Sequence, residues 1–407
     1  MKHIFFCIIG VFGIACSVNK NDKIGYVEPV ILSDSTKFSQ AVFLTKDNYD
    51  NPVIVWSSAD TDSGQYVLNF RQFDKQQETF GEIQKIQKTK GMQAHHESMA
   101  KIAIKHNGDI IAIYRRENKA SKRRFAGDLF YVESTDNGAT WSDESKFVTD
   151  TTSASQSFYD LARLVNGEIG VTWLDSRKLE KDEGSSIFFK QTSHFGGFRE
   201  EVAVQGSTCQ CCRTELQVDK HGKLNIAFRD IINDSIRDMV YVYSEDNGNT
   251  FSKGKRISAD NWMIRGCPHT GPTIATNDTQ RATAWFTMGG GKGVYFTVGA
   301  SSNNTSPTRT LIDKNATHPQ MIWAKNYFYL TYELRLNNNK GEAYRQVVIT
   351  KIDENGKVNE TINVSELGID SQMPVIAQVD DSSLMVAWVE QRIKHKSVIK
   401  ATLILLE

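Results

Sequence analysis

Four of the six cysteines stand in two short segments that could hold a metal ion, form disulfides or supply a reactive thiol. Thiolates together with an imidazole are the donor set that Cu(I) and Zn(II) prefer, although the spacing matches no standard zinc motif. In an exported protein, one disulfide from Cys267 to the upstream group is the ordinary alternative, and a redox or nucleophilic thiol is the third. The sequence leaves these three interpretations open. The residues concerned are Cys209, Cys211, Cys212, Cys267 and His269.

Basic and acidic side chains recur directly after apolar segments that end on an aromatic residue, as in Trp173-Leu-Asp175-Ser-Arg177. Guanidinium groups bind carboxylates and sulfates bidentately. A ring of them is destabilised by repulsion between like charges unless anions neutralise it. The pattern therefore favours an anionic glycan as ligand, although acids in the same segments could answer the charge internally. The candidate ligand-binding residues are Arg115, Arg177, Arg213, Arg229, Arg335 and Arg392.

Glycoside chemistry at such a site would need two carboxylates ~5–9 Å apart or a histidine and a tyrosine acting together. The candidate catalytic residues are Asp175, Asp230, Glu333, Tyr159 and His95. A metal-binding protein that uses the cysteines, with Cu or Zn as its cofactor, is one alternative function. A noncatalytic interaction scaffold is another, because a fold does not fix a function.

Seven short apolar segments end on an aromatic residue at nearly constant spacing, and they predict the elements that must position these side chains. The successive gaps are 58, 59, 55, 57, 47 and 56 residues. Repeats of this length built from short strands, with no sustained helical periodicity, predict an all-β protein and a seven-bladed β-propeller. A six-bladed propeller is the alternative. The aromatic residues are Trp56, Tyr114, Trp173, Phe228, Trp285, Tyr332 and Trp388.

Antiparallel order places the start of the first strand and the end of the second strand of every blade on one face of a propeller, around the central channel. Most of the candidate residues occupy those two positions. We therefore expect the cysteines, histidines and arginines to gather on this face, with Cys212 close to Cys267. The last repeat, Val375 to Leu406, offers only three strands, so Tyr26 to Leu32 is predicted to complete it and to close the ring.

Two repeats carry the turn sequences Ser134-Thr-Asp136-Asn-Gly138-Ala-Thr140-Trp141 and Ser244-Glu-Asp246-Asn-Gly248-Asn-Thr250-Phe251. These resemble the Asp-box of the sialidase-like propellers with BNR repeats. The cysteine segments also resemble those of a bacterial lipoprotein subgroup of that superfamily. The resemblance implies the propeller fold and exo-sialidase-like glycoside hydrolysis as one activity. The Arg-Ile-Pro signature of true sialidases is absent, so their arginine triad is not transferred to this chain.

The first residues have the pattern of an export signal followed by a lipid anchor. A basic start and an apolar run over residues 1–15 are typical of a signal peptide and too short to span a bilayer. Cys16, in Gly13-Ile14-Ala15-Cys16-Ser17, resembles the lipidated cysteine of bacterial lipoproteins. This predicts a tether over 16–23 and a propeller over 24–407, held at the outer membrane of the cell envelope by lipid alone.

The charge balance argues against a nucleic-acid partner. The chain of 407 residues has 48 Lys and Arg against 48 Asp and Glu, whereas nucleic-acid binding needs a basic surface that displaces counterions. We expect a monomer that binds an anionic saccharide or glycoconjugate.

Overall fold

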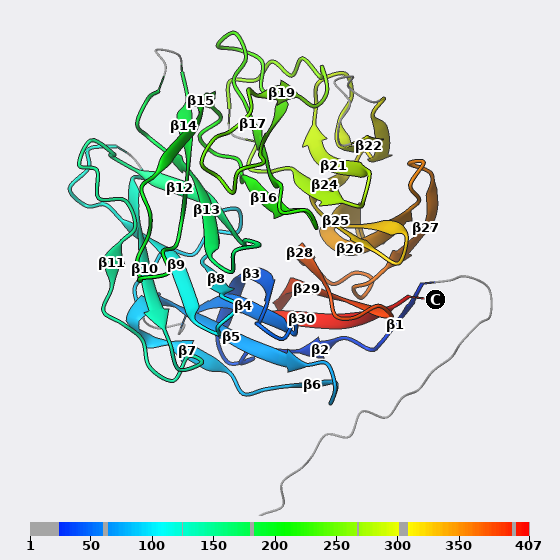
Figure 1. The fold of residues 1–407 in the computed structure, drawn as a ribbon. Helices are drawn as coiled ribbons and strands as arrows, with labels where there is room; N and C mark the ends of the chain where they lie inside the picture. The colour runs from blue at the N-terminus through cyan, green and yellow to red at the C-terminus, as the bar shows by residue number, and fades with distance from the viewer. Residues whose placement is uncertain are drawn as a thin grey trace, which may run out of the picture.

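A computed structural model describes residues 24–407 except 60–63, 124, 180–182, 267, 301–307, 393–395 and 407. These residues form seven antiparallel sheets arranged in a ring (Figure 1). The seven-bladed propeller predicted from the aromatic spacing is confirmed. The predicted signal peptide, Cys16 and the tether lie outside the described residues.

Six of the seven sheets are built from strands that are consecutive in sequence, and the seventh also takes the two N-terminal strands. The first holds β3 (Phe38–Lys46), β4 (Pro52–Ala59), β5 (Tyr66–Asp74), β6 (Thr79–Phe80) and β7 (Gln84–Ile86). The second holds β8 (Lys101–Ile104), β9 (Ile110–Glu117), β10 (Gly127–Ser134) and β11 (Ser145–Lys146). The third holds β12 (Gln156–Arg163), β13 (Ile169–Asp175), β14 (Ser185–Gln191) and β15 (Val202–Thr208). The fourth holds β16 (Glu215–Val218), β17 (Leu224–Arg229), β18 (Met239–Ser244) and β19 (Lys255–Arg256).

The second half of the ring repeats this order. The fifth sheet holds β20 (Thr273–Thr276), β21 (Gln280–Thr287), β22 (Gly293–Ala300) and β23 (Thr310–Asp313). The sixth holds β24 (Ala316–Ala324), β25 (Tyr327–Asn337), β26 (Ala343–Ile352) and β27 (Val358–Asn363). The seventh holds β28 (Ser371–Gln378), β29 (Ser383–Arg392) and β30 (Lys396–Leu405), together with β1 (Gly25–Tyr26) and β2 (Val30–Ile31).

The first strands of the seven sheets surround the axis of the ring (Figure 1). They contact one another in the cyclic order β3, β8, β12, β16, β20, β24, β28 and back to β3. The starts of these strands therefore face one another around a common centre, as the sequence predicted.

The ring is closed by the N-terminal segment. β1 pairs with the C-terminal strand β30 through Gly25↔Leu405, and β2 pairs with it through Val30↔Ala401. Leu32, just after β2, is 1% exposed. The prediction that Tyr26 to Leu32 would complete the last blade is confirmed, and the pairing covers an edge that would otherwise be open.

The seven aromatic residues that revealed the repeat all lie in second strands, with at most 3% of their surface exposed. They pack in the apolar layers between neighbouring sheets, as Trp173 of the third sheet does against Phe147, which follows the last strand of the second. Neighbouring blades hold one another by this packing, which is expected of a repeat architecture.

The two Asp-box turns connect third and fourth strands. In the first, the backbone N–H and the hydroxyl of Thr140 donate to the Asp136 carboxylate at 2.8 and 2.6 Å. Gly138 has φ +87°, a conformation that glycine adopts without steric cost. The side chains of this turn are occupied in forming it, so its role is structural.

One short 3-10 helix, η1 (Gln87–Thr89), is the only helix in the described part of the chain. Within that part, no helix has the length and apolar character that crossing a membrane would require.

Candidate functional site at the propeller axis

Several first strands bulge near their starts, where they approach the axis. The pairing register shifts between Ser157 and Asp160 in β12, and between Thr317 and Gln320 in β24. β3 and β28 shift in the same way. Each bulge holds a residue other than glycine in the left-handed region, and His269 just before β20 shares that conformation. These residues, which we call the axial residues, are Ala41, Phe158, His269, His318 and Met373, with φ of 48° to 56°.

Left-handed backbone at a bulky side chain is uncommon and is tolerated where the surroundings fix it, often at functional sites. Here the neighbouring blades supply the missing hydrogen bonds. At Phe158 the backbone N–H donates to Ser98 Oγ at 2.9 Å, and the carbonyl accepts from Thr214 Oγ1 at 2.9 Å. At Met373 the N–H donates to Glu333 Oε2 at 2.7 Å. The bulges are therefore locked by contacts across the ring.

His318 and Glu333 form the central charged pair of the site. His318 Nδ1 lies 2.9 Å from Glu333 Oε1, and His318 Nε2 lies 3.2 Å from the carbonyl oxygen of His269. Burial alone lowers the pKa of His318, but the negative charge of Glu333 outweighs it and raises the pKa above its ordinary value. Burial likewise acts to raise the pKa of Glu333, yet His318 and the Met373 N–H lower it. Both shifts favour an imidazolium paired with a carboxylate.

Two exposed histidines lie beside this pair. The ring centroids of His95 and His269 are 6.0 Å apart, and the His95 ring also meets the edge of Phe158 at 5.7 Å. His95 has an exposed side, but the protein around the rest of its ring removes water and so lowers its pKa. His95 is therefore a neutral imidazole near pH 7 that can accept a proton.

Burial also lowers the pKa of the adjacent His96, to about 4. Its Nδ1 atom is buried and has no hydrogen-bond partner among the described residues. Buried polar atoms are normally paired, so this nitrogen marks a place where a ligand group or a water is expected.

Arg213 and Glu97 form a buried ion pair beneath the histidines. Arg213 Nη1 lies 3.3 Å from Glu97 Oε1, and the two side chains are 5% and 2% exposed. Arg213 also donates to the carbonyls of Pro272 and Pro319 at 3.2 Å, while Glu97 accepts from the Gly271 N–H at 3.1 Å. The pair ties blades two, four, five and six together, so both terminal nitrogens of the predicted ligand-binding Arg213 are engaged by protein groups.

The structure places Tyr159, Asp175 and Arg177 in structural networks. Tyr159 is fully buried, and its hydroxyl donates to the Ile113 carbonyl at 2.8 Å. Asp175 is fully buried and accepts from Trp173 Nε1 at 3.1 Å and from Ser153 Oγ at 2.7 Å. Arg177 is surrounded by three carboxylates, which raise its pKa against the opposing effect of burial. A substrate could not reach the Tyr159 hydroxyl or the Asp175 carboxylate in this arrangement.

The guanidinium groups of two other predicted arginines donate hydrogen bonds to neutral oxygen atoms. Arg229 is 1% exposed; it donates to the carbonyls of Arg237, Thr270 and Phe286 and lies 4.9 Å from the Trp262 ring centroid. Arg115 donates to the carbonyl of Gln156 at 2.8 Å, to that of Phe125 at 2.5 Å and to the Gln93 amide oxygen. These contacts hold the guanidinium groups in place without neutralising them.

The remaining predicted residues lie at the ends of second strands. Arg335 is exposed in β25. Arg392, with 45% of its side chain exposed, pairs with Glu390 at 2.8 Å. Asp230 follows β17, is 8% exposed, and its backbone N–H donates to the Asp238 carbonyl at 2.9 Å.

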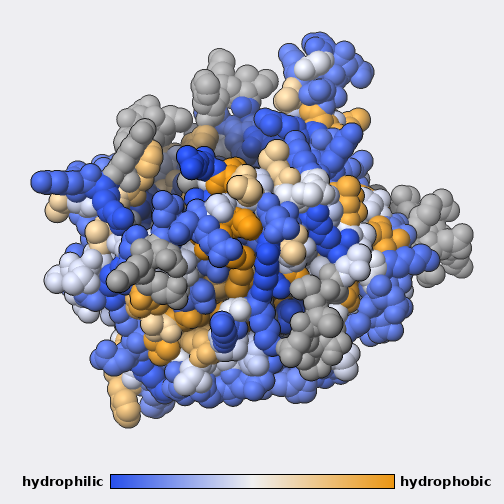
Figure 2. Space-filling view, turned by 90° about the horizontal axis from the view of Figure 1, so that it is seen from above, coloured by the Kyte–Doolittle hydropathy of each residue, from blue (hydrophilic) through white to orange (hydrophobic). Residues whose placement is uncertain are grey.

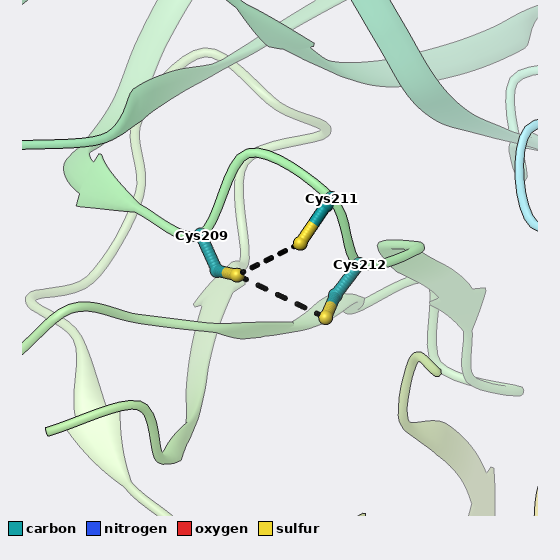
Figure 3. A group of neighbouring side chains, drawn as sticks. All are labelled: Cys209, Cys211 and Cys212. Atoms are coloured by element: carbon teal, nitrogen blue, oxygen red, sulfur yellow. Dashed lines mark hydrogen bonds between the residues drawn. The ribbon is translucent and has the colours of Figure 1, made fainter. Parts of the chain in front are cut away.

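Three of the predicted metal-ligating cysteines meet in the link between β15 and β16 (Figure 3). Cys209 Sγ lies 3.6 Å from Cys211 Sγ and 3.9 Å from Cys212 Sγ, and all three residues are free thiols. Cys267 lies outside the described residues, so its predicted proximity to Cys212 and its disulfide stay predictions. His269 lies with His95 among the axial histidines.

Sequence reasoning missed a polar network that joins the first strands. Lys101 Nζ lies 2.6 Å from Asp160 Oδ1, and the other oxygen of Asp160 accepts from the Leu216 N–H at 2.7 Å. In the same network, burial and the charge of Asp160 raise the pKa of Glu215 to about 7. These residues lie inside first strands whose sequences show only the ordinary alternation of a β-strand. No local motif distinguishes them as members of a network.

Two cavities lie away from the axial histidines. One of about 430 Å³ opens where the first strands end, lined by apolar side chains such as Ile322, Trp323 and Ile376. Another of about 480 Å³ lies between the outer strands of the second and third blades, beside Lys190, whose pKa burial lowers to about 8. The axial site is preferred because titratable side chains with shifted pKa values, His95, His96, His318 and Glu333, gather there.

Seven sheets of four or five strands around a polar axis, with Asp-box turns between third and fourth strands, define a sialidase-like β-propeller. Residues 50–349 match the family described as the BNR repeat-like domain, and the chain belongs to this family. No curated protein matches the chain in sequence.

Solved structures share this fold at low sequence identity. Polysaccharide lyase Uly1 is 12% identical over 90% of this chain and 90% of its own, with a TM-score of 0.56. A protein of unknown function from Dyadobacter fermentans DSM 18053 is 10% identical over 94% of this chain and 99% of its own, with a TM-score of 0.52. The Hadza microbial sialidase Hz136 is 14% identical over 85% of this chain and 75% of its own, with a TM-score of 0.46. At these identities the likeness concerns the fold alone.

Proposed function

We propose that this propeller binds, and at His95 processes, an anionic glycan at the axial site. The main support is the group of histidines there: His95 and His269 are exposed side by side, and His96 presents an unpaired buried nitrogen. The cation of Arg115, held by neutral oxygens, favours an anion at this face. Membership of the BNR repeat-like family, and the glycan-active proteins that share the fold, agree with a saccharide ligand.

In this proposal each group has a separate role. His95 and His269 contact the saccharide. Neutral His95 acts as general base: it takes a proton from the water that attacks the anomeric carbon, and the proton passes to the leaving oxygen as the glycosidic bond breaks. Glu333 holds His318 protonated and so acts as a positioning residue. Exposed Arg335 contributes attraction that salt weakens.

Glycan binding can be tested on an array that carries sialylated, uronate-containing and sulfated glycans with neutral counterparts. We expect the full chain to retain acidic glycans, and His95→Ala and His269→Ala each to lower the affinity about 10-fold, because each removes a hydrogen bond to a charged ligand. Arg335→Ala should lower it less, and most at low salt. Product release from the retained glycans, lost in His95→Ala, would demonstrate processing.

A matched control is His221→Ala, since His221 is an exposed histidine in the turn between β16 and β17, at the other end of the strands. Retention of no acidic glycan, or an equal loss of binding in the control, would contradict the proposal.

We also propose that the mature chain is a lipoprotein of the cell envelope, anchored through Cys16. The apolar run before this cysteine and the polar segment after it support the assignment. The full chain expressed in a bacterium should partition into detergent and carry an acylated N-terminal cysteine by mass spectrometry. Cys16→Ser should leave it in the aqueous phase; equal partitioning of both proteins would argue against a lipid anchor.

A further inference from the structure

Three cysteine side chains converge in the link between β15 and β16, apart from the histidines of the proposed glycan site. Cys209, Cys211 and Cys212 turn their sulfur atoms toward one another (Figure 3), and all three sulfurs lie within 4.8 Å. The residues are 1%, 5% and 2% exposed. A single buried cysteine often serves only as a small apolar side chain. Three of them with their sulfur atoms in mutual contact are more than such packing requires.

The spacing of the sulfurs suits a shared metal ion. Two thiolates bound to one ion at ~2.3 Å, with tetrahedral or trigonal angles, lie ~3.8–4.0 Å apart. The Cys209 sulfur is 3.6 and 3.9 Å from its two neighbours. A disulfide would need a separation of ~2.05 Å, and the chain would have to move to reach it.

The surroundings are apolar but supply two positive charges. The cysteines pack in a buried cluster with Phe158, Phe228 and other hydrophobic residues. Arg237 Nη1 lies 3.2 Å from Cys209 Sγ, and the Arg229 guanidinium acts electrostatically on Cys212. Three thiolates and one monovalent cation carry a net charge of −2, which these two arginines offset, as a buried charge requires.

We propose that Cys209, Cys211 and Cys212 bind one Cu(I) ion as three thiolates. Soft thiolate ligands select Cu(I), Zn(II) and iron–sulfur clusters, and structural zinc almost always takes four ligands. Among the described residues, no histidine, aspartate or glutamate atom joins the three sulfurs within 4.8 Å. Within the part of the chain that the structure describes, the donors are thus three sulfurs alone, a set that favours Cu(I). Binding displaces the remaining thiol protons to solvent and transfers no electrons.

The experiment uses the full chain, reduced and free of oxygen, with Cu(I) supplied as its bicinchoninate complex. We expect the protein to withdraw one equivalent of copper, and X-ray absorption to show three sulfur neighbours and no nitrogen. Cys209→Ser, Cys211→Ser and Cys212→Ser should each weaken binding at least about 100-fold, since each removes a ligand. Arg237→Gln should weaken it about 10-fold through the lost charge compensation.

His221→Ala is the matched control and should bind copper like the unchanged chain, because His221 is exposed in the turn between β16 and β17. If a cysteine variant does not fold, alkylation of the unchanged chain replaces it: copper should protect these three thiols, read by peptide mass spectrometry. No copper withdrawn, a four-ligand or nitrogen-containing shell, preference for Zn(II), or a Cys209–Cys212 disulfide in the anaerobically purified protein would each overturn the assignment. Glycan binding is measured separately, so failure of either proposal leaves the other standing.

Discussion

Arg213→Met is expected to lower the free energy of unfolding by about 3–5 kcal/mol, because it leaves the buried Glu97 carboxylate without its counter-charge. Glu97 is 2% exposed, and among the described residues it would keep the Gly271 N–H and a distant imidazole, with His318 Nε2 at 3.9 Å. The carbonyls of Pro272 and Pro319 would also lose a donor. Chemical denaturation followed by fluorescence of the buried tryptophans measures the loss.

The control removes a long cationic side chain from an ion pair on the surface. Lys88 pairs with Asp143 at 2.7 Å, but the two side chains are 47% and 97% exposed. Lys88→Met should therefore cost about 1 kcal/mol or less. If Arg213→Met cost no more than Lys88→Met, the buried pair would not hold the axial site. The double variant Glu97→Gln with Arg213→Met should be more stable than Arg213→Met alone, since no unpaired charge remains.

Removal of residues 24–32 is expected to lower the free energy of unfolding by about 3–6 kcal/mol, as Ile24 and Leu32 leave buried positions. The truncation also uncovers the edge of β30, because the Val27 and Leu32 N–H groups no longer donate to Leu403 and Ile399. An exposed strand edge promotes association between chains. Thermal unfolding and size-exclusion chromatography at several concentrations should show a less stable protein that self-associates.

Two point variants separate burial from edge pairing. Leu32→Ala should cost about 2–4 kcal/mol, whereas Ile31→Ala, at a side chain 44% exposed, should cost well under 1 kcal/mol. A truncated chain that stayed monomeric and equally stable would mean that the ring does not depend on this segment.

The repeat architecture could be read from the sequence because its signals are local. Each aromatic residue such as Trp285 closes an alternating segment between turn residues, and that pattern needs no knowledge of the neighbouring blade. The closing strand followed from counting, since the last repeat lacked one strand. Both are consequences of a ring in which every unit buries its faces against the next.

The geometry of the axial site was harder to predict, because bulges and ion pairs depend on contacts between blades. No sequence pattern near Phe158 predicts that Ser98 and Thr214 form hydrogen bonds with its backbone. A signal was present at two positions: Pro319 and Pro374 interrupt first strands, and proline inside a sheet is confined to edges and bulges. The partners of Arg177 and Arg229 could not be predicted from the sequence. A long side chain can reach several acceptors, and these acceptors come close to it only in the folded ring.

The bulged first strands have a consequence for re-engineering this protein. At Ala41, Phe158, His318 and Met373 the chain already bends out of the pleat, and blades on either side hold that bend at Phe158 and Met373. Among the four, Met373 is half-buried, and its side chain can be exchanged while the surrounding sheets keep their register. Asparagine and glycine, which accept this backbone shape, should be the mildest exchanges.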